Sequence, residues 1–181
     1  MNMTLWSEEL DILKTNKITI VGVLTAISLV IFILEAQIPP LVPIPGIKLG
    51  LANIITLIAV YAVGRREAFI ILMLRIIIGS IYSGNMQSFI YSLAGGIMCY
   101  IVTVLLSFVL KNEFIWVVSI FGALAHIAGQ LGAAYIITGV EQIIYYTPIL
   151  IISAVITGTF TGVSAQGVYK QLKKITGRGG R

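Results

Sequence analysis

Arg75 has the most demanding chemistry in this sequence, because it interrupts an apolar run that extends from 68 to 82. A charged side chain in such surroundings must meet an anion, a group of carbonyl oxygens or water. Glu35 and Glu141 stand only at the ends of their apolar runs. Two interpretations stay open. The first is a structural arginine held by backbone carbonyls, and the second is an arginine that binds a substrate carboxylate through its two-pronged guanidinium.

His126 and Gln130 form a second polar pair inside an apolar run. They are one helical turn apart, so both side chains lie on the same face of a helix. A single histidine in this setting is either a core residue with satisfied hydrogen bonds or a ligand contact. We keep both interpretations and name the pair as candidate binding residues.

Other polar and aromatic residues stand where apolar runs begin or end. Gln87 and Tyr91 are four residues apart and share a helix face. With Asn53 and Asn85 they could line an outward-facing pocket with aromatic walls and a few polar anchors, which is typical of small-molecule sites. The predicted substrate-binding residues are Lys48, Asn53, Arg75, Tyr82, Asn85, Gln87, Tyr91, His126 and Gln130.

The segment 39–55 holds four of the five prolines, and Lys48 is its only charge. Proline fixes φ and lacks an N–H, so it breaks a helix interior and favours extended geometry in the residue before it. The pattern predicts a stiff, non-helical loop. It is either a plain connector or, because loops often carry function, a binding loop that presents Lys48.

Several kinds of chemistry are excluded by what the sequence lacks. It contains no P-loop motif, so any ATP would be used by partner ATPases rather than by this chain. One histidine and one cysteine make a zinc or haem site unexpected. Asp11 is the only aspartate, which excludes aspartate-rich magnesium clusters for prenyl diphosphate chemistry. We therefore expect no catalytic residues, no metal, no cofactor in this chain and no enzymatic activity.

The composition indicates an integral membrane protein. Hydrophobic residues make up 58% of the chain, charged residues only 10%, and the mean hydropathy is +1.02. Soluble domains carry about 25% charged residues. The net charge of +5 does not indicate nucleic-acid binding, because the charges stand at the ends of apolar segments, as membrane topology requires.

Spanning helices need about 20 mostly apolar residues each. The sequence predicts six, over 18–34, 49–63, 68–82, 87–110, 114–138 and 143–169. The predicted organisation is a cytoplasmic tail over 1–17, a membrane domain over 18–169 and a basic cytoplasmic tail over 170–181. The fold class is therefore an all-α membrane protein with six transmembrane helices, the second and third of them short.

Orientation follows from the distribution of lysine and arginine. In a six-helix topology one side receives Lys14, Lys17, Arg65, Arg66, Lys111, Lys170, Lys173, Lys174, Arg178 and Arg181. Lys48 alone falls on the other side, and Arg75 lies within the membrane. The positive-inside rule places both termini in the cytoplasm.

Small residues recur four apart in several apolar runs, which allows membrane helices to approach closely. Gly22 and Ala26 stand apart from the others because they lie near the cytoplasmic end of the first run. This pair is a candidate docking face for another protein.

Three motifs carry a family resemblance: PGIKLGLANI at 45–54, GNMQSFIYSLAGG at 84–96 and GALAHIAGQL at 122–131. With them the chain resembles the bacterial Gx transporter family, whose members are often labelled heptaprenyl diphosphate synthase component I. That family is similar to the substrate-binding S components of energy-coupling factor (ECF) transporters. The resemblance implies an S-component-like bundle in the bacterial cytoplasmic membrane, and it matches Gly22 and Ala26 to the face that meets the coupling subunit.

Two functions remain open at this point. The resemblance implies an S component that imports a small vitamin-like molecule, with a quinone (menaquinone) precursor as the suggested substrate. Its partners would be a transmembrane coupling subunit and two ABC-type ATPases. The alternative is an accessory membrane subunit of heptaprenyl diphosphate synthesis or of an extracellular electron-transfer system.

Overall fold

The computed structural model describes residues 3–38, 48–139 and 145–175, with side chains described from residue 16 onward. All regular structure in these ranges is helical, as predicted. The helices are α1 (Met3–Glu35), α2 (Asn53–Ala62), α3 (Arg65–Ser83), α4 (Met86–Val109), the short 3₁₀ helix η1 (Asn112–Phe114), α5 (Ile115–Thr138) and α6 (Thr147–Ile175). The proline-rich residues 39–47 and the turn at 140–144 lie outside the described ranges, so the expectations for them stay predictions.

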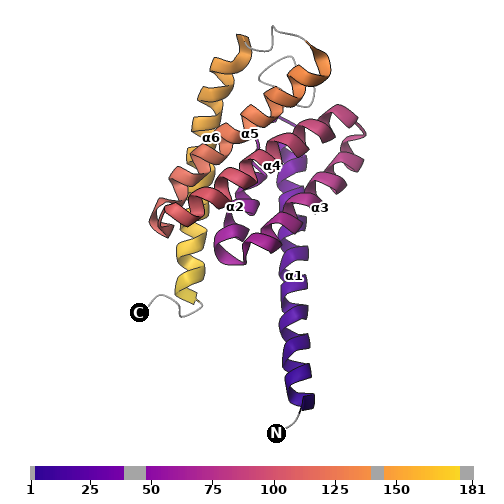
Figure 1. Ribbon diagram of the computed structural model, residues 1–181, viewed down its shortest axis with the longest axis vertical. Helices are drawn as coiled ribbons and strands as arrows, with labels where there is room; N and C mark the ends of the chain where they lie inside the picture. The colour runs from indigo at the N-terminus through magenta and orange to yellow at the C-terminus, as the bar shows by residue number, and fades with distance from the viewer. Residues whose placement is uncertain (1–2, 39–47, 140–144, 176–181) are drawn as a thin grey trace.

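The bundle is built around α2. This helix contacts α1, α3, α4 and α6, and its residues from Ile55 to Val60 are all buried. On one side α4, α5 and α6 pack in sequence, with the most extensive contact between α4 and α5 (Figure 1). On the other side α1 packs against α3.

Four helical segments are long and apolar enough to cross a membrane: Asn16–Glu35, Met86–Val109, Asn112–Thr138 and Thr147–Ile175. The expectation of six spans is therefore supported for four segments only. With its 10 residues, α2 is about 15 Å long, half the thickness of a bilayer core. Protein surrounds α2 on several sides, so its backbone is shielded from lipid. The α3 helix is not one of these four segments, because the charges of its first turn and of Arg75 lower its mean hydropathy.

The outer surface of the bundle is apolar. Large side chains with more than two thirds of their surface exposed include Ile81, Val109 and Ile136. Soluble proteins rarely expose such continuous apolar surface. Together with the four long apolar helices, this surface identifies a membrane protein.

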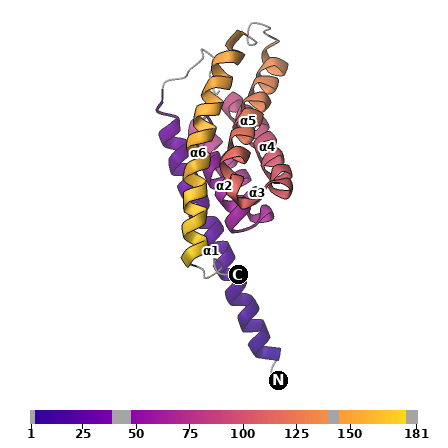
Figure 2. The same ribbon diagram turned by 90° about the vertical axis from the view of Figure 1, so that its left-hand side faces the viewer.

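The first helix begins earlier than expected. The residues predicted as a tail, 1–17, are helical from Met3 onward. They include no proline or glycine and several good helix formers, so nothing interrupts the helix before the apolar run. Figure 2 shows α1 continuing well past the other helices at its N-terminal end.

Glycines allow α4, α5 and α6 to approach closely. A Cβ on Gly129 would lie 2.6 Å from the carbonyl oxygen of Ala94 in α4. A Cβ on Gly162 would lie 2.6 Å from the Cα of Trp116, so α6 meets α5 through a glycine as well. The predicted role of these small residues in helix packing is confirmed.

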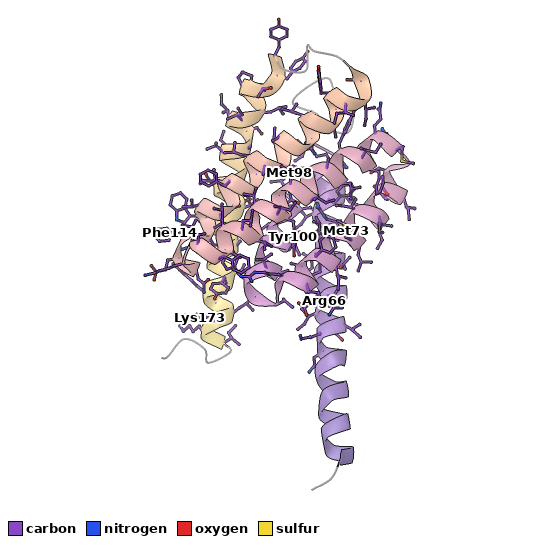
Figure 3. The ribbon with its side chains drawn as sticks, viewed as in Figure 1. Arg66, Met73, Met98, Tyr100, Phe114 and Lys173 are labelled. Atoms are coloured by element: carbon purple, nitrogen blue, oxygen red, sulfur yellow. The ribbon has the colours of Figure 1, made fainter. Side chains whose placement is uncertain are left out.

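The predicted clustering of cations at one end is visible in the contacts. Lys17 pairs with Glu67 at 3.3 Å, which joins α1 to the start of α3. The guanidinium of Arg65 lies 3.6 Å from the ring centroid of Phe108, near the end of α4. Arg66 and Lys173 lie toward the same end of the bundle (Figure 3). Which membrane face this end occupies stays a prediction.

Labelling of single cysteines tests the orientation. We expect Met86→Cys to react with a membrane-impermeant thiol reagent from outside the cell, and Lys111→Cys to react only after permeabilisation. Met86 is exposed and avoids neighbouring Gly84, whose φ of 59° disfavours a side chain. The background carries Cys99→Ala, because Cys99 is the only native cysteine. The reverse labelling pattern would invert the proposed topology.

Candidate functional site

The end of α1 and the entry to α2 are joined by Glu35. Its carboxylate oxygens accept from the backbone N–H of Gly50 at 2.6 Å and of Ala52 at 3.4 Å. Gly50 has a φ of 81°, and a Cβ there would lie 2.8 Å from Cδ2 of His126. Glycine is therefore required at this turn both by its conformation and by the closeness of the histidine ring.

Asn53, the first residue of α2, stands at the centre of a buried polar cluster. Nη2 of Arg75 donates to Oδ1 of Asn53 at 3.0 Å, and Nδ2 of Asn53 lies 3.1 Å from Nδ1 of His126. A guanidinium can only donate hydrogen bonds, so Oδ1 of Asn53 faces Arg75 and the NH₂ group of Asn53 faces the imidazole of His126. Nδ1 of His126 must then accept, which makes the imidazole neutral with its proton on Nε2.

Gln130 and Lys48 extend the cluster. Oε1 of Gln130 accepts from the backbone N–H of Lys48 at 3.4 Å. The Lys48 ammonium lies 3.5 Å from the ring centroid of Phe32, a cation–π distance. Burial lowers the pKa of Lys48 to about 8; Arg75 also lowers it, whereas Glu35 raises it.

Three polar atoms of this cluster are buried without a hydrogen-bond partner among the described residues: Nε of Arg75, Nε2 of His126 and Nε2 of Gln130. With the orientations set above, all three are N–H donors. Unpaired buried donors are costly, and native structures usually explain each one by a ligand, an ion or a water. The cluster can therefore bind a group that supplies hydrogen-bond acceptors.

The space beside the cluster is small. A cavity of about 20 Å³ is lined by Gly50 and Asn53 on one side and by α4, α5 and α6 on the other, which is room for about one water molecule. A ligand with a ring therefore requires these elements to move apart. The turn that carries Gly50 and Ala52 lies outside the helices and is held by Glu35 through two backbone N–H groups.

The structure brings together five of the predicted site residues and separates the other four. Lys48, Asn53, Arg75, His126 and Gln130 form the cluster through the contacts given above. The cavity beside Asn53 is not lined by Tyr82, Asn85, Gln87 or Tyr91.

The four side chains have different local surroundings. Oδ1 of Asn85 caps α4 by accepting from the N–H groups of Gln87 and Ser88. Gln87 is exposed, and Tyr82 is 65% exposed. Tyr91 is buried in an apolar core with residues of α5 and α6. Their contact with a ligand stays a prediction.

Glu35 is the residue that sequence reasoning missed. It was placed at the end of an apolar run, but the structure buries it to 5% exposure against the entry of α2. The signal in the sequence was a glutamate that precedes its partners, the backbone N–H groups of Gly50 and Ala52, by 15 and 17 residues. That distance is not readable from helical periodicity.

The predicted docking pair lies on the open face of α1. Gly22 and Ala26 are exposed, and a Cβ on Gly22 would meet nothing within 4 Å. The structure therefore leaves this face free for a partner, and the assignment of a coupling subunit to it stays a proposal.

Comparison with known proteins places the chain in a family. No curated protein and no solved structure matches it. A family model described as heptaprenyl diphosphate synthase component I matches residues 24–168. The match covers most of the chain, from within α1 to near the end of α6, and includes the whole polar cluster. The chain therefore belongs to the heptaprenyl diphosphate synthase component I family, the Gx family that its motifs resemble.

Proposed function

We propose that this protein is the substrate-binding S component of an ECF-type transporter and that its polar cluster binds a small carboxylate, a quinone precursor. The observation that carries the proposal is the set of three buried donors around Asn53 that have no acceptor among the described residues. A carboxylate supplies two oxygens with about four acceptor sites. Hydrogen bonds from a charged donor to a carboxylate are roughly twice as strong as neutral ones.

A membrane-embedded site of this kind suits binding and release better than catalysis. The cluster contains a neutral histidine, two amides, an arginine and a lysine. The described residues contain no group of three His, Cys, Asp or Glu side chains that could hold a metal ion. A quinone precursor such as a naphthoate combines a flat apolar ring with one carboxylate, and both parts suit a cluster set among apolar helices.

The family description supports a second candidate function, an accessory membrane subunit of heptaprenyl diphosphate synthesis. The two proposals differ in their partners. Purification of the tagged protein from its native membrane should recover a transmembrane coupling subunit and two ATPases if it is an S component. Recovery of a prenyl synthase subunit without ATPases would favour the second candidate.

Bulky residues on the open face of α1 should prevent assembly. We expect Gly22→Leu or Ala26→Leu to abolish recovery of the coupling subunit, because close approach of membrane helices needs small side chains. Ligand affinity of the solitary protein should be unchanged, since the polar cluster does not include this face.

Gly132→Leu provides the matched control for that experiment. A Cβ on Gly132 also meets nothing within 4 Å, but the residue lies on α5. Assembly should survive this substitution. Equal loss of assembly in Gly132→Leu, or loss of ligand binding in Gly22→Leu, would contradict the assignment of the face.

Lys48 gives the proposed site a pH dependence. The protonated ammonium attracts an anion, and its pKa of about 8 means that the charge is lost as pH rises through that value. Affinity for a carboxylate such as 2-naphthoate should therefore fall several-fold between about pH 7 and about pH 9. Lys48→Met should bind more weakly at pH 7 and lose this dependence. The same pH profile in both proteins would remove Lys48 from the site.

A further inference from the structure

A second cavity lies between α1, α2 and α6, at the end of the bundle where the cations gather. Its volume is about 490 Å³, which is far larger than the 20 Å³ beside Asn53 and lies within the range of about 300–1,000 Å³ that is typical of small-molecule sites. Most of its wall is apolar and includes Ile20 and Leu24 of α1, Ile58 of α2 and Leu172 of α6. The proposed transport function does not use this cavity.

The cavity exists because α2 separates two longer helices. Both α1 and α6 pack against α2 but not extensively against one another, and the last residues of α2 line the cavity between them (Figure 1). Ile20 is 43% exposed and Leu172 is 39% exposed. The cavity therefore opens on the apolar outer surface of the bundle, which faces lipid.

One part of the wall is polar. Nδ2 of Asn112 donates to the hydroxyl oxygen of Tyr169 at 2.9 Å, which leaves the Tyr169 O–H able to donate to a ligand. Lys173 also lines the cavity and belongs to the basic last turn of α6. Tyr61 meets Tyr169 edge to face, with ring centroids 6.0 Å apart, and its buried hydroxyl has no hydrogen-bond partner among the described residues. The cavity thus combines a long apolar wall with one cationic, hydrogen-bonding end.

We propose that this cavity binds an anionic phospholipid, with an acyl chain between α1 and α6 and the phosphate at Lys173 and the Tyr169 hydroxyl. Basic pockets between membrane helices bind the head groups of anionic lipids, and each lysine near the membrane surface adds to the attraction. The apolar wall suits the chain and the lysine suits the phosphate. The proposal does not rest on the transport function, because none of these residues belongs to the polar cluster.

The lipid site and the predicted docking pair occupy different faces of α1. Successive residues of an α-helix are about 100° apart around its axis. Gly22 therefore lies about 200° around the helix from Ile20, and Ala26 lies about 200° from Leu24. A partner seated on Gly22 and Ala26 would leave the cavity available to lipid.

Native mass spectrometry of the full-length protein measures which lipid it retains. Protein in detergent is incubated with equal amounts of phosphatidylglycerol, which is anionic, and phosphatidylcholine, which has the same acyl chains and no net charge. The wild type should retain phosphatidylglycerol at least about fivefold more than phosphatidylcholine, because one lysine near an anionic head group contributes about that factor. In a separate arm, an equal concentration of farnesyl diphosphate should leave the phosphatidylglycerol bound.

A matched pair of variants tests the cation. Lys173→Gln should lower the ratio of phosphatidylglycerol to phosphatidylcholine about fivefold. Arg66→Gln removes another exposed cation toward the same end of the bundle (Figure 3), but Arg66 does not line the cavity. This variant should keep the wild-type ratio.

A second pair tests the apolar wall. Leu24→Trp should abolish retention of both lipids, because the larger ring fills the space that the acyl chain needs. Val30→Trp adds the same ring to the same helix at an exposed position outside the cavity, and retention should survive. If Leu24→Trp does not fold, Leu172→Trp on the α6 wall carries the test.

Four results would overturn the proposal. They are equal retention of the two lipids by the wild type, an unchanged ratio in Lys173→Gln, undiminished retention in the folded tryptophan variant of the wall, and displacement of phosphatidylglycerol by farnesyl diphosphate. The last result would assign the cavity to a prenyl diphosphate instead. None of them bears on the carboxylate site, which is tested separately with 2-naphthoate.

Discussion

Arg75→Ala should bind 2-naphthoate about ten- to a hundredfold more weakly than the wild type while remaining folded. A hydrogen bond to a charged group contributes about 1.5–3 kcal/mol, and each 1.4 kcal/mol changes affinity tenfold. The substitution also removes the donor that orients Asn53, so the imidazole of His126 loses its fixed proton position. Titration of both proteins under identical conditions measures the effect.

Arg75→Lys should restore binding only in part. Lysine keeps the charge but has a single point of contact, whereas the guanidinium can hold Asn53 with Nη2 and present its Nε to a ligand. The competing interpretation is a structural Arg75, and it predicts loss of folded protein in Arg75→Ala. Thermal unfolding of the same samples separates the two. A stable Arg75→Ala protein with normal affinity would remove Arg75 from the site.

Gly129→Leu should prevent the α4 and α5 helices from packing and should yield little folded protein. A Cβ at this position would stand 2.6 Å from a backbone oxygen of Ala94, and backbone atoms cannot rotate away as a side chain can. Overpacking of a well-packed core costs about 1–3 kcal/mol, and occasionally more. We expect the upper end of this range, measured as a lowered unfolding temperature and as loss of a single peak in gel filtration.

Gly132→Leu is the control on the same helix. It adds the same side chain three residues away, where the space is open, and should leave the unfolding temperature almost unchanged. Equal destabilisation by the two substitutions would show that helix propensity alone, and not close packing of α4 on α5, governs the result. The pair therefore isolates the contribution of the helix contact.

Helices and their apolar surfaces were predictable, because both follow from local pattern. Runs of apolar residues predicted α4 and α5 to within one residue of the observed bounds, whereas α6 extends six residues beyond the predicted end at 169. A short second helix was predicted, but its late start at Asn53 was not predictable. Leu49 and Ala52 are as compatible with a helix as Ile55 is, and what excludes them is the turn at Gly50, which depends on the distant partners Glu35 and His126.

The candidate site was predictable in its residues but not in its grouping. Asn53, Arg75 and His126 were identified because polar groups inside apolar segments are costly, and they do meet. Asn85 was assigned to the same pocket by its depth, and the structure shows its side chain capping α4. Capping and ligand binding draw on the same residue types, so a single sequence does not distinguish them. Glu35 was missed for the converse reason, since its partners are backbone groups.

The most direct measurement of the central claim is the identity and amount of small molecule retained by the purified protein. Protein isolated from its native membrane is denatured, and the released compounds are quantified by mass spectrometry. The account predicts an aromatic acid with one carboxylate in the wild type and in Glu67→Gln, with the compound lost from Arg75→Ala. A prenyl diphosphate in the wild type, or equal amounts of the acid in Arg75→Ala, would contradict it.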